Sequence, residues 1–191
     1  MINEQLSEAC YLYNAALQDR KDSWEKAGKT VTYYDQSYQI KEIRDSGYTK
    51  LYNYDSCTNI LRKLDKSFSA FFRRIKRGEA PGYPRFKSVK RYNSIEFCYG
   101  KGIKLLKNKK LRLGPIGNIK IKLHREIIGK IKTAIIKKDG DKYYVSFCAE
   151  SFPEKLDKSD LSIGIDLGIS NFAVLSDETI IENPKHSRKQ H

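Results

Sequence analysis

The spacing of apolar residues divides the chain into a helical first part and a second part of alternating strands. In residues 3–26, apolar side chains recur every three or four positions, which is the period of one face of a helix. The residues that mark this face are Leu6, Cys10, Tyr13 and Leu17. A weaker pattern of the same kind predicts a second helix over residues 36–44.

The third predicted helix has the clearest apolar face. Its apolar positions follow the helical period from Cys57 to Ile75, and either Asp55 or Ser56 can cap its first turn. Gly78 is placed to end it. The helix also carries an aromatic cluster, Phe68, Phe71 and Phe72. We expect this cluster to lie in the core of a three-helix bundle rather than to form a platform for stacked bases.

After Gly78 the pattern changes, because the prolines and glycines of residues 80–84 cannot continue a helix. We place a domain boundary here and expect residues 1–78 to form a helical module and residues 79–152 a basic antiparallel β-barrel or sheet. Period-two alternation predicts strands over residues 95–99, 103–106, 111–113, 119–123, 130–137 and 142–149.

Positive charge is concentrated in this second part. The formal net charge is +14, and residues 73–142 hold 22 Lys and Arg against 5 Asp and Glu, a balance of +17. Such a field attracts polyanions and releases their counterions on binding, which gives sequence-independent affinity for DNA and RNA. A merely solubilising surface is normally mixed in sign, and a membrane-binding surface favours an amphipathic helix, so both alternatives are weaker. Protection of sheet edges explains only a few of the lysines.

The first candidates for nucleic-acid contact follow the Pro/Gly break. Cations cluster there with aromatic side chains, a combination that suits phosphate binding together with base stacking. These candidates are Arg85, Lys87, Lys90 and Arg91, with Tyr83 and Phe86. Lys120 and Lys122 come next, because alternation in a strand places their ammonium groups about 6.6 Å apart on one face.

A lone acid marks the last part of the chain. Residues 161–168 predict a strand that places Asp166 among small neighbours, followed by strands over residues 172–175 and 179–181. Magnesium prefers oxygen ligands, and two-metal phosphodiester cleavage uses several carboxylates. From the pattern alone, an ordinary aspartate and a first metal ligand are equally good interpretations of Asp166.

Other features limit the class of protein. The chain contains no apolar run of about 18 residues and does not begin like a signal peptide, so we expect a cytoplasmic protein without membrane contact.

The cysteines are too far apart to start a zinc knuckle or a small disulfide framework, and we expect them to be reduced and mostly buried. They are Cys10, Cys57, Cys98 and Cys148.

Four blocks of sequence, in order, resemble the TnpB/OrfB proteins of bacterial insertion sequences, which are relatives of type V CRISPR nucleases. The blocks are residues 13–17, 64–74, 82–88 and 164–171, and residues 181–186 are similar as well. The resemblance implies an α+β protein with a helical recognition module and a wedge-like barrel that holds guide RNA and target DNA. It also implies that residues 161–191 begin a ribonuclease-H-like (RuvC) domain, with Asp166 as the first magnesium ligand.

The chain also departs from the family pattern. A short basic strand usually precedes the first helix, and the family's remaining carboxylates and paired cysteines lie downstream of the position of His191. We do not expect Asp177, Glu178 or Glu182 to reach metal ions at Asp166, since they lie at or beyond a hairpin tip. The expectation is therefore a truncated copy that binds guide RNA and DNA, takes no small-molecule substrate, and does not cleave unless another chain completes its site.

Two other functions are consistent with these residues. A non-cleaving, RNA-guided DNA-binding regulator would share every binding feature. An ATPase of the sugar-kinase, actin or heat-shock type carries a similar Gly-Ile-Asp-Leu-Gly strand, but only 23 residues follow Gly168, too few for an adenosine site. The sequence leaves the oligomeric state open.

Overall fold

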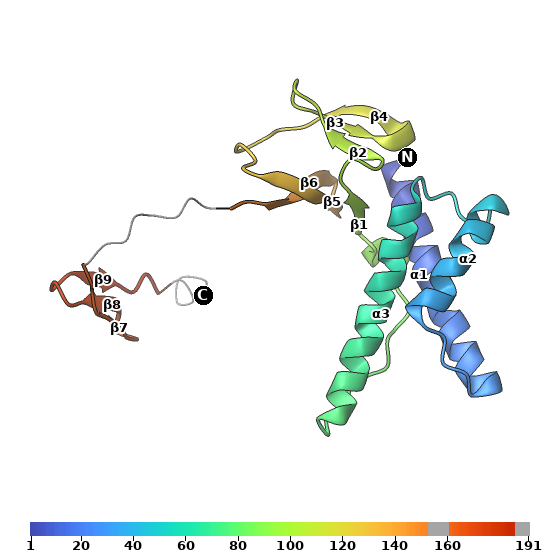
Figure 1. Cartoon of the computed structure of the whole chain (residues 1–191), viewed down its shortest axis with the longest axis horizontal. Coiled ribbons are helices and arrows are strands. Elements are labelled where there is room, and N and C mark those ends of the chain that lie inside the picture. The colour runs from blue at the N-terminus through green and yellow to red at the C-terminus, as the bar shows by residue number, and fades with distance from the viewer. Residues whose placement is uncertain (153–160, 186–191) are drawn as a thin grey trace. The chain divides into compact units, whose positions relative to one another are not determined.

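The computed structural model describes residues 1–152 and 161–185. It divides the chain into two compact units, Met1–Phe152 and Pro153–His191 (Figure 1). The first unit holds three α-helices, two short 3₁₀ helices and six strands, and the described part of the second holds three short strands. The predicted α+β composition is confirmed.

The three predicted helices are present and lie side by side in Figure 1, as α1 (Ile2–Ala27), α2 (Tyr33–Asp45) and α3 (Tyr54–Lys76). Helix α2 begins earlier than predicted because Thr32 and Asp35 form a capping box, in which the Thr32 N–H donates to Asp35 Oδ2 at 2.8 Å.

Helix α3 also begins earlier than the sequence predicted. Its capping residue is Asn53, whose Oδ1 accepts from the Asp55 N–H at 2.8 Å, so the choice of Asp55 or Ser56 was wrong. At the other end, Gly78 follows the helix with φ at +73°, a left-handed conformation that favours glycine. The predicted role of Gly78 is confirmed.

Two antiparallel sheets of three strands follow the helices. One has the order β1-β5-β6, formed by Ser94–Cys98, Lys130–Asp139 and Lys142–Glu150. The other has the order β2-β3-β4, formed by Ile103–Leu105, Lys110–Leu113 and Gly117–Lys120. Short 3₁₀ helices cover Val89–Arg91 and Gly114–Ile116. Over the residues that the structure describes, neither sheet closes into a barrel, so the open-sheet alternative holds.

One hydrophobic core is shared by the helices and both sheets. Leu17 of α1 and Leu64 of α3 are fully buried, and the same cluster includes Phe97 of β1 and Ile103 of β2. The Ser56 hydroxyl of α3 also donates to the Glu96 carbonyl of β1 at 3.4 Å. The change from helix to strand after Gly78 is as expected, whereas the division into domains at that point stays a prediction.

The aromatic cluster of α3 is only partly in this core. Phe68 is 8% exposed, but Phe72 is 51% exposed and Phe71 is partly buried. The prediction that all three rings are core was wrong, because the buried cluster reaches only as far as Phe68 along α3. Phe71 and Phe72 lie beyond it and line a cavity instead.

The four cysteines carry free thiols. Cys10 and Cys57 are buried, whereas Cys98 is partly buried and Cys148 is exposed. Burial raises the pKa of the Cys10 and Cys57 thiols, which keeps them protonated and chemically quiet. The expectation of mostly buried cysteines therefore holds for two of the four.

The second unit contains an antiparallel sheet of order β7-β8-β9, formed by Ile165–Leu167, Asn171–Leu175 and Ile180–Glu182. The first of these strands begins four residues later than predicted. The turn between β8 and β9 falls at residues 176–178, as expected. Three short strands do not distinguish a ribonuclease-H-like domain from other folds, so that assignment stays a prediction.

Candidate nucleic-acid interface

One side of the β2-β3-β4 sheet packs into the core and the other presents only cations and an amide. Alternation turns Ile103, Leu111 and Leu113 inward, where each is at most 2% exposed. The outward residues include four exposed cations, here called the basic face: Lys104, Lys110, Arg112 and Lys120.

The strand register places the cations of the basic face directly opposite one another. Lys110 pairs with Lys120, and Lys104 pairs with Arg112. Side chains opposite each other in such pairs are about 5 Å apart at Cβ, where like charges destabilise a sheet. Residues 101–123 contain eight Lys and Arg and no acid. Within the described part of the chain, none of the four cations forms an ion pair, so a bound polyanion would relieve their repulsion.

A second cationic region follows α3, in the segment that returns along α1. Asn14 of α1 holds this segment with both ends of its amide, because Nδ2 donates to the Lys87 carbonyl and Oδ1 accepts from the Lys87 N–H, each at 2.8 Å. The Cys10 thiol donates to the same carbonyl at 3.2 Å. These contacts fix the backbone at Lys87 and leave its ammonium group exposed.

Beside this segment, two lysine ammonium groups each lie over one of two neighbouring tyrosine rings. Lys87 Nζ lies 5.5 Å from the centre of the Tyr13 ring, and Lys63 Nζ lies 4.9 Å from that of Tyr92. The two rings are 6.2 Å apart. Burial and, secondly, the charge of Lys87 lower the pKa of the Lys63 ammonium. A bound phosphate would interact favourably with both cations.

Helix α3 adds cations that sequence reasoning missed. A groove of about 270 Å³ is lined by Arg62, Lys63 and Lys66 of α3 and by residues of β1. These three positions lie outside the +17 stretch, on the polar side of the helix. Their spacing of one, three and four residues was visible in the sequence, but nothing there showed that this side faces a groove.

Asp166 lies in β7, exposed, and its cross-strand neighbours are apolar. It pairs with Val174, which pairs in turn with Ile180, so this row of the sheet offers no second side-chain oxygen. Asp177 is used within the β8-β9 turn, where its Oδ1 accepts from the Thr179 N–H at 3.0 Å. Hydrogen bonding by the Thr179 side chain and, secondly, by this N–H lowers the pKa of Asp177. Among the described residues, no three His, Cys, Asp or Glu are placed to hold a metal ion. The residues present do not by themselves fit a magnesium site.

No protein-family model matches this chain. It is 27% identical over 181 residues, 91% of its length, to a protein of Escherichia coli (strain K12) named "Putative RNA-guided DNA endonuclease InsQ". It is 26% identical over 185 residues, 93% of its length, to a protein of Streptomyces pristinaespiralis with the same name but without "InsQ". The predicted resemblance to TnpB-type RNA-guided endonucleases is confirmed. The chain spans 43% and 44% of the lengths of these two relatives.

The TnpB-type resemblance rested partly on residues 13–17, and the structure explains one of them. Asn14 is the residue that clamps the Lys87 backbone. Its role could not be found from sequence, because the two residues are 73 positions apart.

In the described ranges, no helix is both long and apolar enough to span a membrane.

The predicted contact residues fall into separate groups. Arg85, Lys87, Lys90 and Arg91 are exposed along one segment, and Lys120 belongs to the basic face. Lys122 is exposed just beyond the end of β4. Among the described contacts, none joins the segment to the basic face.

The two predicted aromatic residues are engaged with other parts of the protein. Phe86 lies beneath the Lys21 ammonium, 5.6 Å from Nζ to the ring centre. Tyr83 packs against Phe68 and Phe71. Tyr83 and Phe86 therefore do not form one stacking platform with the neighbouring cations, and their proposed contacts with nucleic acid stay predictions.

Proposed function

We propose that this chain binds guide RNA and target DNA in the cytoplasm, as a TnpB-type protein, and that the basic face supplies its main grip on phosphates. The observation that carries the proposal is the placement of Lys110 opposite Lys120 and of Lys104 opposite Arg112 on an exposed sheet without acids. The names of the two relatives support nucleic acid as the polyanion. Arg85 and Lys87 supply a second set of backbone contacts.

Charge contacts of this kind predict a measurable dependence on salt. Each phosphate contact contributes about 0.9 to the slope of log affinity against log salt for duplex DNA, and about 0.7 for single strands. Four contacts on the basic face therefore correspond to a slope of about 3 to 4. Cross-strand pairs without acids concentrate these contacts on one surface, so removing them should affect binding much more than removing scattered lysines.

The test replaces all four cations of the basic face by glutamine and measures binding of labelled RNA hairpins and DNA duplexes at several salt concentrations. The salt slope should fall by about 3 to 4. A control variant with the same net charge replaces four exposed lysines elsewhere, Lys41, Lys50, Lys130 and Lys142. Equal losses in the two variants would show that only total charge matters and would reject the basic face as the interface.

We further propose that the chain binds guided DNA without cleaving it alone. Asp166 is the candidate first magnesium ligand, and its neighbours Val174 and Ile180 leave it without a partner carboxylate in its row. Two-metal cleavage requires several carboxylates. Cleavage of a guided DNA target by the purified chain in magnesium would refute this proposal. Copurification of a defined small RNA that directs binding to a matching duplex would support a guided, non-cleaving role.

A further inference from the structure

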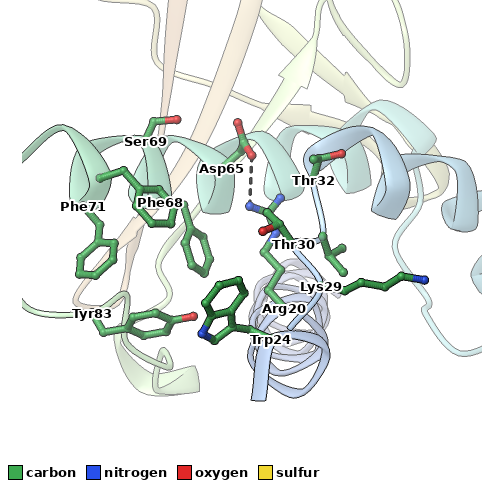
Figure 2. A pocket seen from close by; sticks show the side chains of 12 residues that line it. Arg20, Trp24, Lys29, Thr30, Thr32, Asp65, Phe68, Ser69, Phe71 and Tyr83 are labelled. Carbon is green, nitrogen blue, oxygen red and sulfur yellow. Dashed lines mark hydrogen bonds and ion pairs between the residues drawn. The ribbon is translucent and has the colours of Figure 1, made fainter. Parts of the chain in front are cut away.

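An aromatic cavity lies between α1 and α3. It shares no residue with the basic face, and its lining is mainly aromatic rather than cationic. It has a volume of about 460 Å³ and is bounded by α1, the α1-α2 connection, α3 and Tyr83. Figure 2 shows the rings gathered on one side of it and Arg20 with Asp65 on the other. The rings are Trp24, Phe68, Phe71, Phe72 and Tyr83.

Part of the aromatic wall is fixed and part is open. The Tyr83 ring meets Phe68 and Phe71 edge-to-face, with centres 5.5 Å and 5.4 Å apart. Phe72 is 51% exposed and Trp24 is 62% exposed. Two large aromatic side chains thus face solvent beside a preformed wall, which marks a binding surface more often than an ordinary monomer surface.

Arg20 gives the cavity a polar floor with one donor unused. Its Nε donates to Gln36 and its Nη1 to Asp65, at 2.9 and 3.1 Å. Its Nη2 is buried and has no hydrogen-bond partner among the described residues. A buried donor without a partner is unfavourable, because it has lost its hydrogen bonds to water without gaining others. The Arg20 guanidinium also lies over the Phe68 ring, with its central carbon 5.0 Å from the ring centre, so it belongs to the aromatic wall as well as to the floor.

The charged residues that line the cavity are Arg20, Lys29 and Asp65. Arg20 pairs with Asp65, which leaves Lys29 as the cation without an ion pair among the described lining residues. A planar ring with polar edges joined to a phosphate matches the aromatic wall, the Arg20 floor and the Lys29 ammonium together.

We propose that this cavity holds one unpaired base of a single-stranded nucleic acid, stacked against Phe72 and Trp24 with its acceptors toward Arg20. Base–aromatic stacking contributes about 1–3 kcal/mol per base and tolerates any sequence. The inference rests on the proposed function for the nature of the ligand, but it uses none of the residues of the basic face. It also gives the exposed rings of α3 a role in binding.

The single tryptophan provides a direct test, because Trp24 is the only one in the chain. Its emission is followed while the full chain is titrated with oligouridylate, with oligothymidylate, and with an abasic deoxyribose-phosphate oligomer of the same length. Both base-bearing oligomers should quench Trp24, and the abasic oligomer should bind through its phosphates without quenching. The stronger of the two responses identifies RNA or DNA as the preferred strand.

A matched pair of variants tests the stacking contact itself. Phe72→Ala should weaken binding of the base-bearing oligomers about 5- to 10-fold, at the low end of the stacking range because other rings remain. Ile75→Ala removes another apolar side chain of α3 that is 47% exposed and does not line the cavity, and it should leave affinity unchanged. Circular dichroism and urea denaturation should show both variants folded, since neither side chain is buried.

Three results would overturn the cavity proposal while leaving the proposed function intact. These are equal quenching by the abasic oligomer, binding without any change in Trp24 emission, and equal affinities of the Phe72→Ala and Ile75→Ala variants. In a fourth, separate measurement, a Trp24 response to an apolar dye and to none of the oligomers would also overturn it and indicate an apolar partner. Failure of every oligomer to bind would instead refute the proposed function.

Discussion

The two sheets of residues 1–152 have similar inner faces and different outer faces. In β1-β5-β6, Phe97 and Ile136 enter the core, as Ile103 and Leu113 do in β2-β3-β4. The outer side of the first sheet includes acids, Glu96 and Glu150, and Glu150 pairs with Lys132 at 2.8 Å. The outer side of the second is the basic face.

This difference separates what folding requires from what it tolerates. Both sheets need an apolar inner face, because burying that surface stabilises the unit. Neither needs a uniformly positive outer face, and the pairing of like charges opposes sheet formation. The cations of β2-β3-β4 are therefore the stronger candidates for binding a ligand, whereas the outer side of β1-β5-β6 carries charges of both signs.

The largest effect should come from the inner faces, where the sheets are expected to behave alike. Leu113→Ala and Ile136→Ala each remove a side chain that is at most 5% exposed. Each should lower the free energy of unfolding by about 2–5 kcal/mol, through lost burial and a residual cavity. Urea denaturation measures both. If only one variant were destabilised, the two sheets would not share a core.

A smaller effect should separate the outer faces when nucleic acid is present. Saturation with RNA at 100 times its dissociation constant should raise the free energy of unfolding of the unaltered chain by about 2.7 kcal/mol. At the same RNA concentration, Lys104→Gln with Arg112→Gln should lose much of this gain. Lys137→Gln with Lys142→Gln, on the other sheet, should keep it. Thermal denaturation with and without RNA gives the comparison, and equal losses would argue against a special role for the basic face.

The smallest effect has opposite signs on the two sheets. Lys110→Glu places a carboxylate opposite Lys120 and should stabilise the free protein by about 0.2–1 kcal/mol, while weakening RNA binding. Lys132→Glu breaks the ion pair with Glu150 and places two carboxylates beside each other, so it should destabilise the protein by a similar amount. Urea midpoints at low salt measure both changes. Destabilisation by Lys110→Glu would mean that the like-charge pair carries no strain.

Much of the fold of the first unit could be predicted because its signals are local. The helical period identified all three helices, and alternation identified the strands to within a few residues. The errors lie where a short-range hydrogen bond decides a boundary, as at Asn53, or where a neighbour covers only part of an element. Phe72 illustrates the second kind, since its place in the apolar pattern of α3 does not reveal that its ring stays half exposed.

The candidate site was harder to predict than the fold. Lys120 was identified from alternation, but its partner Lys110 and the pair Lys104 and Arg112 required the strand register. Register depends on which strands pair and at which residue, and no single strand contains that information. Lys63 was missed for a related reason. Its place beside Lys87 depends on how α3 packs in the fold, which the sequence of α3 does not show.

The sequence alone determined which segments become helices and strands, the excess of positive charge after α3, and the likeness to TnpB-type nucleases, because each is written in neighbouring residues or short ordered blocks. Only the tertiary structure decided that the cations of β2-β3-β4 face one another, that Asn14 clamps Lys87, and that the rings around Trp24 enclose a cavity. The physical reason is that these arrangements depend on pairing and packing between residues far apart in the chain, which the order of residues in any one segment does not specify.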